Sequence, residues 1–446
     1  MAQCDDRHLG QLQGVWNPAA DDRVHAHADP PDPAPRVAPG EDEPTRRAGG
    51  PWTSGERGDP DRPRRPNSRG GGEERVDSPP VGRSSKAAVF HGPGEAITIE
   101  EFPLPELRSG EALVRVSLCT ICGSDLHTFT GRRTTPCPTI LGHEIIGRIA
   151  ALGPDQPLVD LRGRILSVGD RVTWTIAASC GDCFYCGEGL TQKCRDLFKY
   201  GHERIAPGHA LSGGMAEYCH LSQGTGILAV PDLLSDKIAC PVNCATATVA
   251  AAVRSAPPIE DRVILIQGAG MLGLTAAAMA GSLGAARVVV SDPDAERLAR
   301  AAAFAATDTV DASSGGEELK KVVGDLTDGR GADTIFEFCG APAALEAGLD
   351  CLRIGGSYLW AGSVAPSTPL ALAPERVVRN LWTISGVHNY THRDLDSALS
   401  FLCEHGADHP FEELVEGVYP LSAAQTALER AGAEGSLRLG LRMEAE

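Results

Sequence analysis

The chain has 446 residues and a formal net charge of −18 at pH 7, with 42% hydrophobic and 22% charged residues. This length is sufficient for two or three domains, each with a core of its own. The acidic balance argues against nucleic acid or an anionic membrane surface as the main partner. No stretch approaches the roughly 18 apolar residues of a membrane span. Since the first ten residues also lack the apolar core of a secretory signal, we expect a cytoplasmic protein.

Residues 1–85 differ in composition from the rest, being rich in proline, arginine and glycine and containing no lysine. Such a segment buries too little apolar surface to offset its ordering entropy, which predicts a disordered N-terminal extension. Its many acidic residues argue against an organelle transit peptide. An upstream start codon or a regulatory tail would each explain it.

From residue 86 the sequence changes to short β-type runs separated by glycine and proline. A compact β-rich unit is therefore expected in this part of the chain. Its predicted strands cover residues 86–90, 96–100, 112–118, 145–150 and 171–174.

Beyond about residue 260, strands and helices alternate. The predicted strands are 263–267, 287–292, 333–338 and 357–360, and the predicted helices are 272–283, a helix starting near 294, 317–326 and 343–352. This alternation predicts an α/β domain with a parallel, doubly wound sheet. From about residue 386 the pattern becomes mixed again, and we expect this end of the chain to pack back on the first domain.

A cluster of four cysteines with C-x2-C-x2-C-x7-C spacing follows the last predicted strand of the β-rich unit. Four thiolates on one short loop close a tetrahedral zinc site that has no open position. An iron–sulfur cluster is disfavoured because ferredoxins use other spacings, and disulfides between such near neighbours would be strained. We therefore predict a structural zinc site made of Cys180, Cys183, Cys186 and Cys194.

A G-x-G-x-x-G pattern lies between the first predicted strand and helix of the α/β part. This context is typical of a dinucleotide-binding loop, in which a helix N-terminus faces the pyrophosphate. The residues expected to bind the cofactor there are Gly268, Gly270, Met271, Leu272 and Gly273. Asp292 ends the next strand and would bind the adenosine ribose, which favours NAD over NADP. Arg297, in the helix that follows, weakens this preference.

Besides the cysteine cluster and the glycine motif, the segment from Cys119 to Glu144 contains cysteine, histidine and carboxylate side chains close together. Such residues form open zinc sites with three protein ligands and one exchangeable position. Spacing alone does not settle which of them coordinate. Cys119 and Cys122, as a bare CxxC pair, are equally compatible with a redox pair or two core thiols.

These motifs, with Gly213–Tyr218 and Cys240–Cys244, occur in the order found in zinc-containing members of the medium-chain dehydrogenase/reductase family, which residues 86–446 resemble. The resemblance implies a zinc-dependent, NAD(P)-linked alcohol dehydrogenase with two zinc ions per chain, assembled as a homodimer or homotetramer. Its domains would be a GroES-like catalytic domain over 86–244, with the zinc lobe at 180–194, a Rossmann NAD-binding domain over 245–385, and a C-terminal segment over 386–446 that completes the catalytic domain.

The resemblance also implies a set of catalytic-zinc residues. Cys122, His143 and Cys244 would be ligands, with Cys240 as the competing choice for the third position. Glu144 resembles a transient or outer ligand of the family.

Other positions match the family's supporting residues. Asp125 would fix the tautomer of His143. Ser124 and His127 match the proton-relay positions, although His127 is also compatible with an ordinary surface histidine. Arg438 matches a contact to the cofactor pyrophosphate, or is a plain surface arginine.

The substrate is indicated by the run His388-Asn389-Tyr390 and the insertion at 157–168, which look closest to a branch with phosphonate-associated and cyclitol-type dehydrogenases. These side chains offer polar contacts to a hydroxylated or anionic substrate, or else stabilise the crossover between domains. We expect a polyol, a cyclitol or another polar secondary alcohol, or its ketone. The alternative function is a catalytically inactive dinucleotide-binding protein, which the complete set of ligand residues and the relay serine argue against.

Overall fold

The computed structural model describes residues 84–364, 368–433 and 435–443, all within one compact unit of the chain. The predicted extension over 1–85 lies outside the described residues except at its end. There Ser84 and Ser85 already belong to strand β1 (Ser84–Phe90), so the strand starts before the predicted boundary at 86. Ser85 is fully buried and pairs with Phe102, a role that its polar side chain did not indicate.

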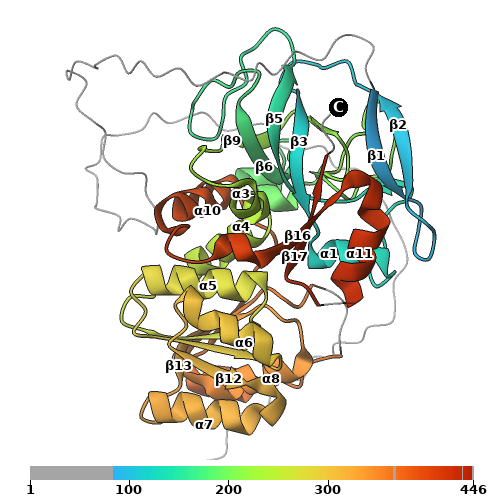
Figure 1. Ribbon diagram of the computed structural model, residues 1–446. Helices are drawn as coiled ribbons and strands as arrows, with labels where there is room; N and C mark the ends of the chain where they lie inside the picture. The colour runs from blue at the N-terminus through green and yellow to red at the C-terminus, as the bar shows by residue number, and fades with distance from the viewer. Residues whose placement is uncertain (1–83, 365–367, 434, 444–446) are drawn as a thin grey trace, which may run out of the picture. The chain divides into compact units, whose positions relative to one another are not determined.

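The β-rich part contains two sheets built mainly from antiparallel neighbours. In the smaller sheet, β1 lies between β2 (Thr98–Pro103) and β4 (Thr139–Ile140). Figure 1 shows β1 and β2 side by side. β2 starts later than predicted because the backbone N–H of Ile97 bonds the side chain of Gln425 rather than a neighbouring strand. The larger sheet has the order β16-β17-β3-β5-β6-β7, with β8 pairing β3 and β9 pairing β6. Its strands from this part are β3 (Ala112–Thr120), β5 (Glu144–Leu152), β6 (Arg171–Ala178), β7 (Phe198–Lys199), β8 (Tyr218–Leu221) and β9 (Thr225–Ala229).

The α/β part is a six-stranded parallel sheet in the order β12-β11-β10-β13-β14-β15, which confirms the doubly wound fold. Its strands are β10 (Val263–Gln267), β11 (Arg287–Asp292), β12 (Asp308–Asp311), β13 (Ala332–Glu337), β14 (Leu352–Trp360) and β15 (Thr383–Gly386). Its helices, of which several are labelled in Figure 1, are α4 (Ala245–Ser255), α5 (Met271–Ser282), α6 (Ala295–Ala301), α7 (Gly316–Leu326), α8 (Pro342–Cys351) and α9 (Pro374–Asn380).

The last segment returns to the β-rich part. β16 (Val415–Pro420) and β17 (Arg438–Arg442) are parallel to each other, and β17 pairs antiparallel with β3. α10 (His392–His405) packs against α4, where Asp394 accepts hydrogen bonds from Arg254, one of them at 3.0 Å. α11 (Ala424–Ala433) completes this segment. The pairing of β17 with β3 brings the end of the chain next to the helix that follows β3.

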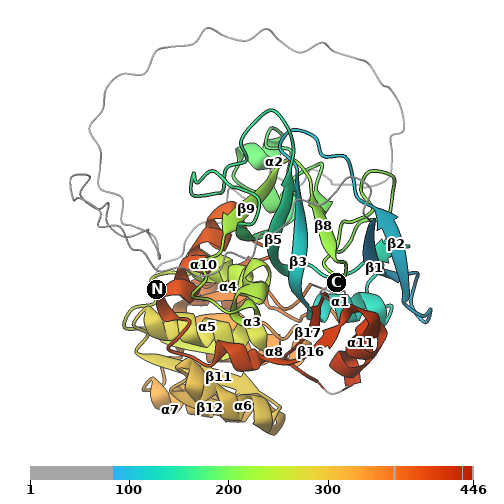
Figure 2. The ribbon, with the colours of Figure 1, turned by 45° about the horizontal axis from the view of Figure 1, so that its top comes forward.

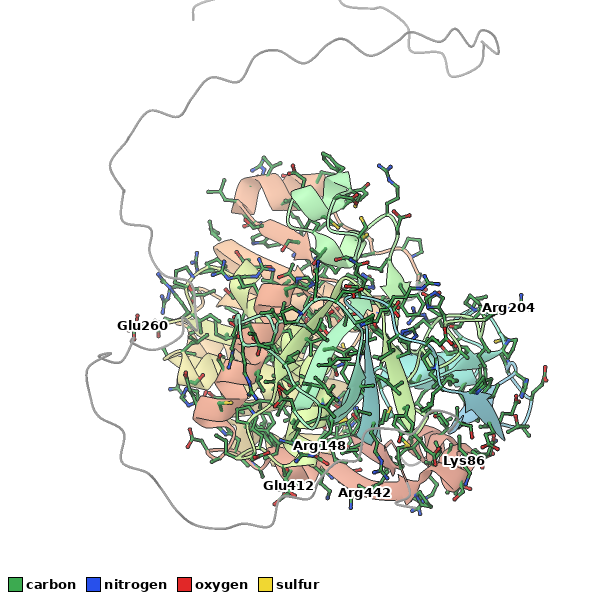
Figure 3. All side chains as sticks on the ribbon, turned by 90° about the horizontal axis from the view of Figure 1, so that it is seen from above. Lys86, Arg148, Arg204, Glu260, Glu412 and Arg442 are labelled. Atoms are coloured by element: carbon green, nitrogen blue, oxygen red, sulfur yellow. The ribbon has the colours of Figure 1, made fainter. Side chains whose placement is uncertain are left out.

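Surface and core follow the usual segregation of charge. Charged side chains such as Arg204 and Glu260 lie at the periphery in Figure 3, whereas Trp174 and Tyr200 are fully buried in the β-rich core. In the described part of the chain, no helix has the length and apolar character needed to cross a membrane.

Candidate functional site

Three ligand residues from distant parts of the chain meet where β3, β5 and α4 come together. Cys122 is the N-cap of α1 (Gly123–Phe129), His143 directly precedes β5, and Cys244 is the N-cap of α4. Their ligand atoms all lie within 4.8 Å of one another, and the two Sγ atoms are 3.9 Å apart. Two thiols and one imidazole suit zinc and leave a coordination position for a further ligand.

The electrostatics of this cluster favour a deprotonated thiol. A hydrogen bond from Cys244 holds the pKa of Cys122 well below its usual range, and the positive charge of Arg438 acts in the same direction. Burial alone would lower the pKa of His143, but Asp125 and Cys122 outweigh it and raise the pKa to about 10. Since a coordinating histidine must be neutral, metal binding at this cluster would release a proton.

Two other cysteines near the cluster are core thiols. Cys240 lies outside the ligand cluster, with its Sγ directed at the backbone oxygens of Leu118 (3.3 Å) and Glu144 (3.2 Å). Cys119 is fully buried in β3, and burial raises its pKa well above the usual value. Of the alternatives left open by the sequence, the geometry favours Cys244 over Cys240.

Asp125 connects two of the ligand segments. Its Oδ2 accepts a hydrogen bond from the backbone N–H of Cys122 (2.9 Å), and its Oδ1 accepts one from Gly142 (3.2 Å). The same Oδ1 lies 3.3 Å from Nδ1 of His143, without the alignment of a full hydrogen bond. This contact leaves Nε2 of His143 on the side of the thiols.

Glu144 lies beside the cluster and is not one of its members. It is fully buried, and its two oxygens accept hydrogen bonds from Nε (2.9 Å) and Nη2 (3.0 Å) of Arg438. Thr120 donates a further bond of 2.6 Å. The bidentate ion pair therefore fixes Glu144 as a neighbour of the ligands. Arg438 is only 7% exposed, so the expectation of a plain surface arginine is wrong.

The two relay candidates lie one turn apart on α1. Ser124 has its Oγ 3.2 Å from Nε2 of His143, which places a hydroxyl directly beside the ligand cluster. His127 is half-buried in the last turn of the same helix. Residues three apart are neighbours on a helix surface, which suits a handover of a proton from one side chain to the other.

Several polar side chains near the cluster were not identified from the sequence. The ring of His202 lies 5.1 Å from that of His143, and its Nδ1 donates to the backbone oxygen of Tyr200. Lys199, in β7, has its pKa lowered to about 8, mainly by partial burial and then by the nearby Arg133. In the sequence, the polar residues at 199–203, directly after the cysteine lobe, could have indicated that this segment lies near the site.

The four cysteines of the predicted lobe also converge, with all ligand atoms within 4.8 Å of one another. Backbone N–H groups point at the sulfurs, including Cys180 to Sγ of Cys194 at 3.2 Å. The lobe contains α2 (Phe184–Gly187), which is labelled in Figure 2. Its Phe184 and Tyr185 side chains are 67% and 44% exposed, so the lobe has little apolar packing of its own. This donor set fits a structural zinc ion, on which the loop would depend.

The glycine-rich loop has the geometry of a nucleotide cradle. Gly268 has φ +101°, and a Cβ at Gly273 would lie 1.7 Å from the backbone oxygen of Gly268. Both positions therefore require glycine for turn geometry and for close packing of α5. A Cβ at Gly270, in contrast, would meet nothing within 4 Å, so this position faces open space. The loop thus fits a phosphate group approaching the N-terminus of α5.

The other predicted cofactor residues surround this loop. Asp292 is buried at the end of β11, where Oδ2 accepts from Ala269 N (2.7 Å) and Oδ1 from Asp294 N (2.9 Å). It therefore orders the glycine loop itself. Arg297 donates to the backbone oxygen of Gly435 (3.0 Å). At the start of α5, Met271 is buried and Leu272 half-buried.

In the predicted substrate run His388-Asn389-Tyr390, the structure gives Tyr390 and His388 different kinds of partner. Tyr390 is buried, and its hydroxyl accepts from Ile176 N (2.9 Å) and donates to the backbone oxygen of Asn243. Of the two alternatives left open by the sequence, these bonds favour the structural one for Tyr390, because its side chain ties the last segment of the chain to β6 and to the turn before α4. The Nδ1 atom of His388 lies 2.6 Å from the Nζ atom of Lys193.

Comparison with known proteins agrees with this geometry. Residues 108–232 match the alcohol dehydrogenase GroES-like domain, and residues 272–404 match the zinc-binding dehydrogenase domain. Sorbitol dehydrogenase of Bacillus subtilis is 32% identical over 355 residues, covering 79% of this chain and 94% of that protein. D-arabitol-phosphate dehydrogenase of Enterococcus avium is 30% identical, covering 78% and 95%.

Solved structures show the same relationship. An alcohol dehydrogenase of Thermotoga maritima superimposes with a TM-score of 0.77 at 30% identity, covering 81% of this chain and all of that one. The GroES-like and Rossmann architecture, the converging ligand residues and these relatives lead to one conclusion. The chain belongs to the zinc-dependent alcohol dehydrogenases of the medium-chain dehydrogenase/reductase family.

Proposed function

We propose that this dehydrogenase transfers a hydride between NAD(H) and a polar secondary alcohol of the polyol or cyclitol type, or its ketone. The observation that carries the proposal is the cluster of Cys122, His143 and Cys244, which leaves one coordination position open beside the hydroxyl of Ser124. The relatives named for sorbitol and D-arabitol phosphate support a hydroxylated substrate.

Two zinc ions per chain are proposed, one at this cluster and one at the four-cysteine lobe. When bound, the catalytic zinc supplies Lewis-acid polarisation of the substrate oxygen, and the nicotinamide ring accepts or donates the hydride. Cys122, His143 and Cys244 would hold the metal. Asp125 orients His143 and ties together the backbone around it.

The proton of the substrate hydroxyl has a path along α1. Ser124 lies beside the ligand cluster and would pass this proton toward the nicotinamide ribose before the hydride leaves. His127, one turn further along the helix and half-buried, would pass the proton to solvent. In the reductive direction the same two side chains would return it.

Cofactor binding is proposed at Gly268–Gly273. Arg438 is not included, because its guanidinium group is buried against Glu144. The carboxylate of Asp292 at the end of β11 supports NAD over NADP, because it would repel a 2′-phosphate. A cytoplasmic location is proposed because cysteines clustered at such short spacings bind zinc in a reducing compartment rather than form disulfides. In the described part of the chain β15 has a free edge, which supports pairing with a second copy in a homodimer or homotetramer.

The test is a turnover assay on the full chain purified with zinc. Rates with NAD and with NADP are compared on sorbitol, a cyclitol and an unbranched short-chain alcohol. We expect NAD-linked oxidation of the hydroxylated substrates and little activity on the simple alcohol. Equal activity on short-chain alcohols, with none on polyols or cyclitols, would contradict the proposed substrate class.

A further inference from the structure

We propose that His202 is a specificity-determining residue, whose Nε2 atom accepts a hydrogen bond from a second hydroxyl of the substrate, besides the hydroxyl that is oxidised. The proposal rests on the proposed function, since it names a further residue of the same site. The ligand would be a molecule with several hydroxyl groups, such as a polyol or a cyclitol, because a simple alcohol has no second hydroxyl to donate.

His202 lies directly beside a ligand residue of the catalytic cluster. The centroid of its ring is 5.1 Å from that of His143, and the two ring planes are inclined at 44°. The ligand atoms of the cluster come from Cys122, His143 and Cys244, so His202 is a neighbour of the metal position rather than a ligand. Its side chain is therefore near a molecule bound at the cluster without being occupied by the metal.

Close backbone packing holds His202 in this place. Gly201 has φ +73°, and a Cβ there would lie 2.6 Å from the backbone oxygen of Gly142, the residue directly before His143. The two segments thus approach each other through glycine, which a larger residue at position 201 would prevent. On the other side of Gly201, Tyr200 is fully buried. The position of His202 is therefore fixed by its neighbours in the chain.

One ring nitrogen of His202 is bonded within the fold. Nδ1 donates a hydrogen bond of 2.8 Å to the backbone oxygen of Tyr200. Because a carbonyl oxygen only accepts, the proton of the neutral ring is on Nδ1, and Nε2 is an acceptor. The residue is only 8% exposed, and burial disfavours the charged form of the ring. The bond to Tyr200 therefore fixes both the ring orientation and the tautomer.

The other ring nitrogen, Nε2, has no hydrogen-bond partner in the described part of the chain, and the protein does not enclose it as it encloses Nδ1 of His143. The buried His220 differs in this respect, since its Nε2 lies 3.1 Å from Oε2 of Glu111. Polar atoms of buried side chains are ordinarily bonded, to the protein or to another molecule. Nε2 of His202 is therefore available to a hydroxyl of the substrate.

A purely structural role of the ring is the competing explanation. The bond to Tyr200 and the ring contact with His143 would then be the whole contribution of His202. A structural role predicts that substitution changes turnover of every substrate to the same extent. Substrate recognition predicts a loss that depends on one hydroxyl of the substrate, so the two explanations separate in kinetics.

The experiment is a double-mutant cycle between His202 and the hydroxyl groups of the substrate, using the zinc-replete full chain. The substrates are the polyol or cyclitol that is turned over fastest and its monodeoxy analogues, each lacking one hydroxyl other than the one oxidised. In the unaltered protein, removal of one such hydroxyl should lower kcat/KM by about tenfold. In His202→Asn the same removal should change kcat/KM by less than about twofold, because the shorter amide replaces Nδ1 but not Nε2.

Two further variants complete the comparison. His202→Gln places a side-chain oxygen near the position of Nε2 and should retain the dependence on that hydroxyl. The matched control is His409→Asn, because Nδ1 of His409 also lies 2.8 Å from a backbone oxygen, that of Ala303, and its ring stacks on Phe304 at 5.8 Å. This control should show the same roughly tenfold effect as the unaltered protein.

Dependence on one hydroxyl in the unaltered protein and in His202→Gln, with its loss in His202→Asn, supports the proposal. No dependence in the unaltered protein, a dependence that His202→Asn retains, or a loss in His202→Gln as well overturns it and leaves the proposed function standing. Absence of turnover on every polyol and cyclitol overturns the proposed function and this inference together. Zinc content and thermal unfolding exclude a folding defect, and His202→Phe, which keeps a ring beside His143, replaces His202→Asn if that variant unfolds.

Discussion

Replacing Arg438 by methionine removes the positive partner of a fully buried carboxylate. Arg438 donates to both oxygens of Glu144, at 2.9 and 3.0 Å, and its Nη2 lies 3.8 Å from Sγ of Cys122. Glu144 has no exposed surface and Arg438 only 7%, so water would not readily replace the lost contacts. The carboxylate would be left in the interior with the hydroxyl of Thr120 as its remaining side-chain donor.

The expected loss follows from these contacts. A hydrogen bond to a charged group contributes about 1.5–3 kcal/mol, and this pair has two of them. Removing one partner of a buried ion pair costs about 3–5 kcal/mol overall, which agrees with that sum. Replacing both partners, as in Arg438→Met with Glu144→Leu, should restore part of the stability because no unpaired charge remains.

The assay is urea unfolding of the zinc-replete protein, followed by tryptophan fluorescence, for which the buried Trp174 is a suitable reporter. The matched control is Arg379→Met. Arg379 and Glu375 are 2.6 Å apart on α9, but their side chains are 77% and 68% exposed. An exposed pair contributes about 0–1 kcal/mol, so this control should be nearly neutral. A loss for Arg438→Met no larger than that of the control would refute the reasoning.

Three further predictions concern the site. Ser124→Ala should lower kcat by about 100-fold or more with zinc content unchanged, because the substrate proton loses its first acceptor, and an unaltered kcat would remove Ser124 from the relay. Asp125→Asn should weaken zinc binding by about 10- to 100-fold in chelator competition, since it orients His143 and holds the backbone of both ligand segments; equal affinity would contradict this. Gly270→Val should raise KM for NAD without lowering the thermal stability, because its side chain would occupy open space, whereas Gly273→Ala should destabilise the fold through its 1.7 Å contact.

Four of the six strands of the Rossmann part were predicted from the sequence, whereas β12 and β15 were not. β10 and β11 have the bounds that their apolar runs indicate, because strands buried on both faces read as continuous hydrophobic segments. β12, Asp308–Asp311, escaped prediction since only Val310 is buried in it. It lies at the edge of the sheet, where a single apolar side chain is enough to anchor a strand.

The site was predictable to different degrees. The cysteine lobe is local, so its spacing alone indicates zinc. Cys122, His143 and Cys244 lie far apart in sequence, and only the resemblance to a family brought them together. His202 carries no motif, and its position 5.1 Å from the ring of His143 depends on how segments far apart in sequence pack.

The structural role of Tyr390 could not be recognised from its neighbours in the sequence. With His388 and Asn389, it forms a polar run that is compatible both with substrate contact and with stabilisation of the crossover between domains. In the structure the Tyr390 hydroxyl bonds backbone groups on both sides of it, at Ile176 and Asn243. A hydroxyl that satisfies buried backbone groups is not distinguishable in sequence from one that faces a substrate.

The central claim, an open catalytic zinc site beside a separate closed one, is tested most directly by counting zinc per chain. Elemental analysis would compare the unaltered protein with Cys122→Ser and Cys183→Ser, together with NAD-linked turnover. We predict two zinc ions in the unaltered protein and one in each variant, with turnover abolished by Cys122→Ser. One zinc ion in the unaltered protein, unchanged by Cys122→Ser, would contradict the account.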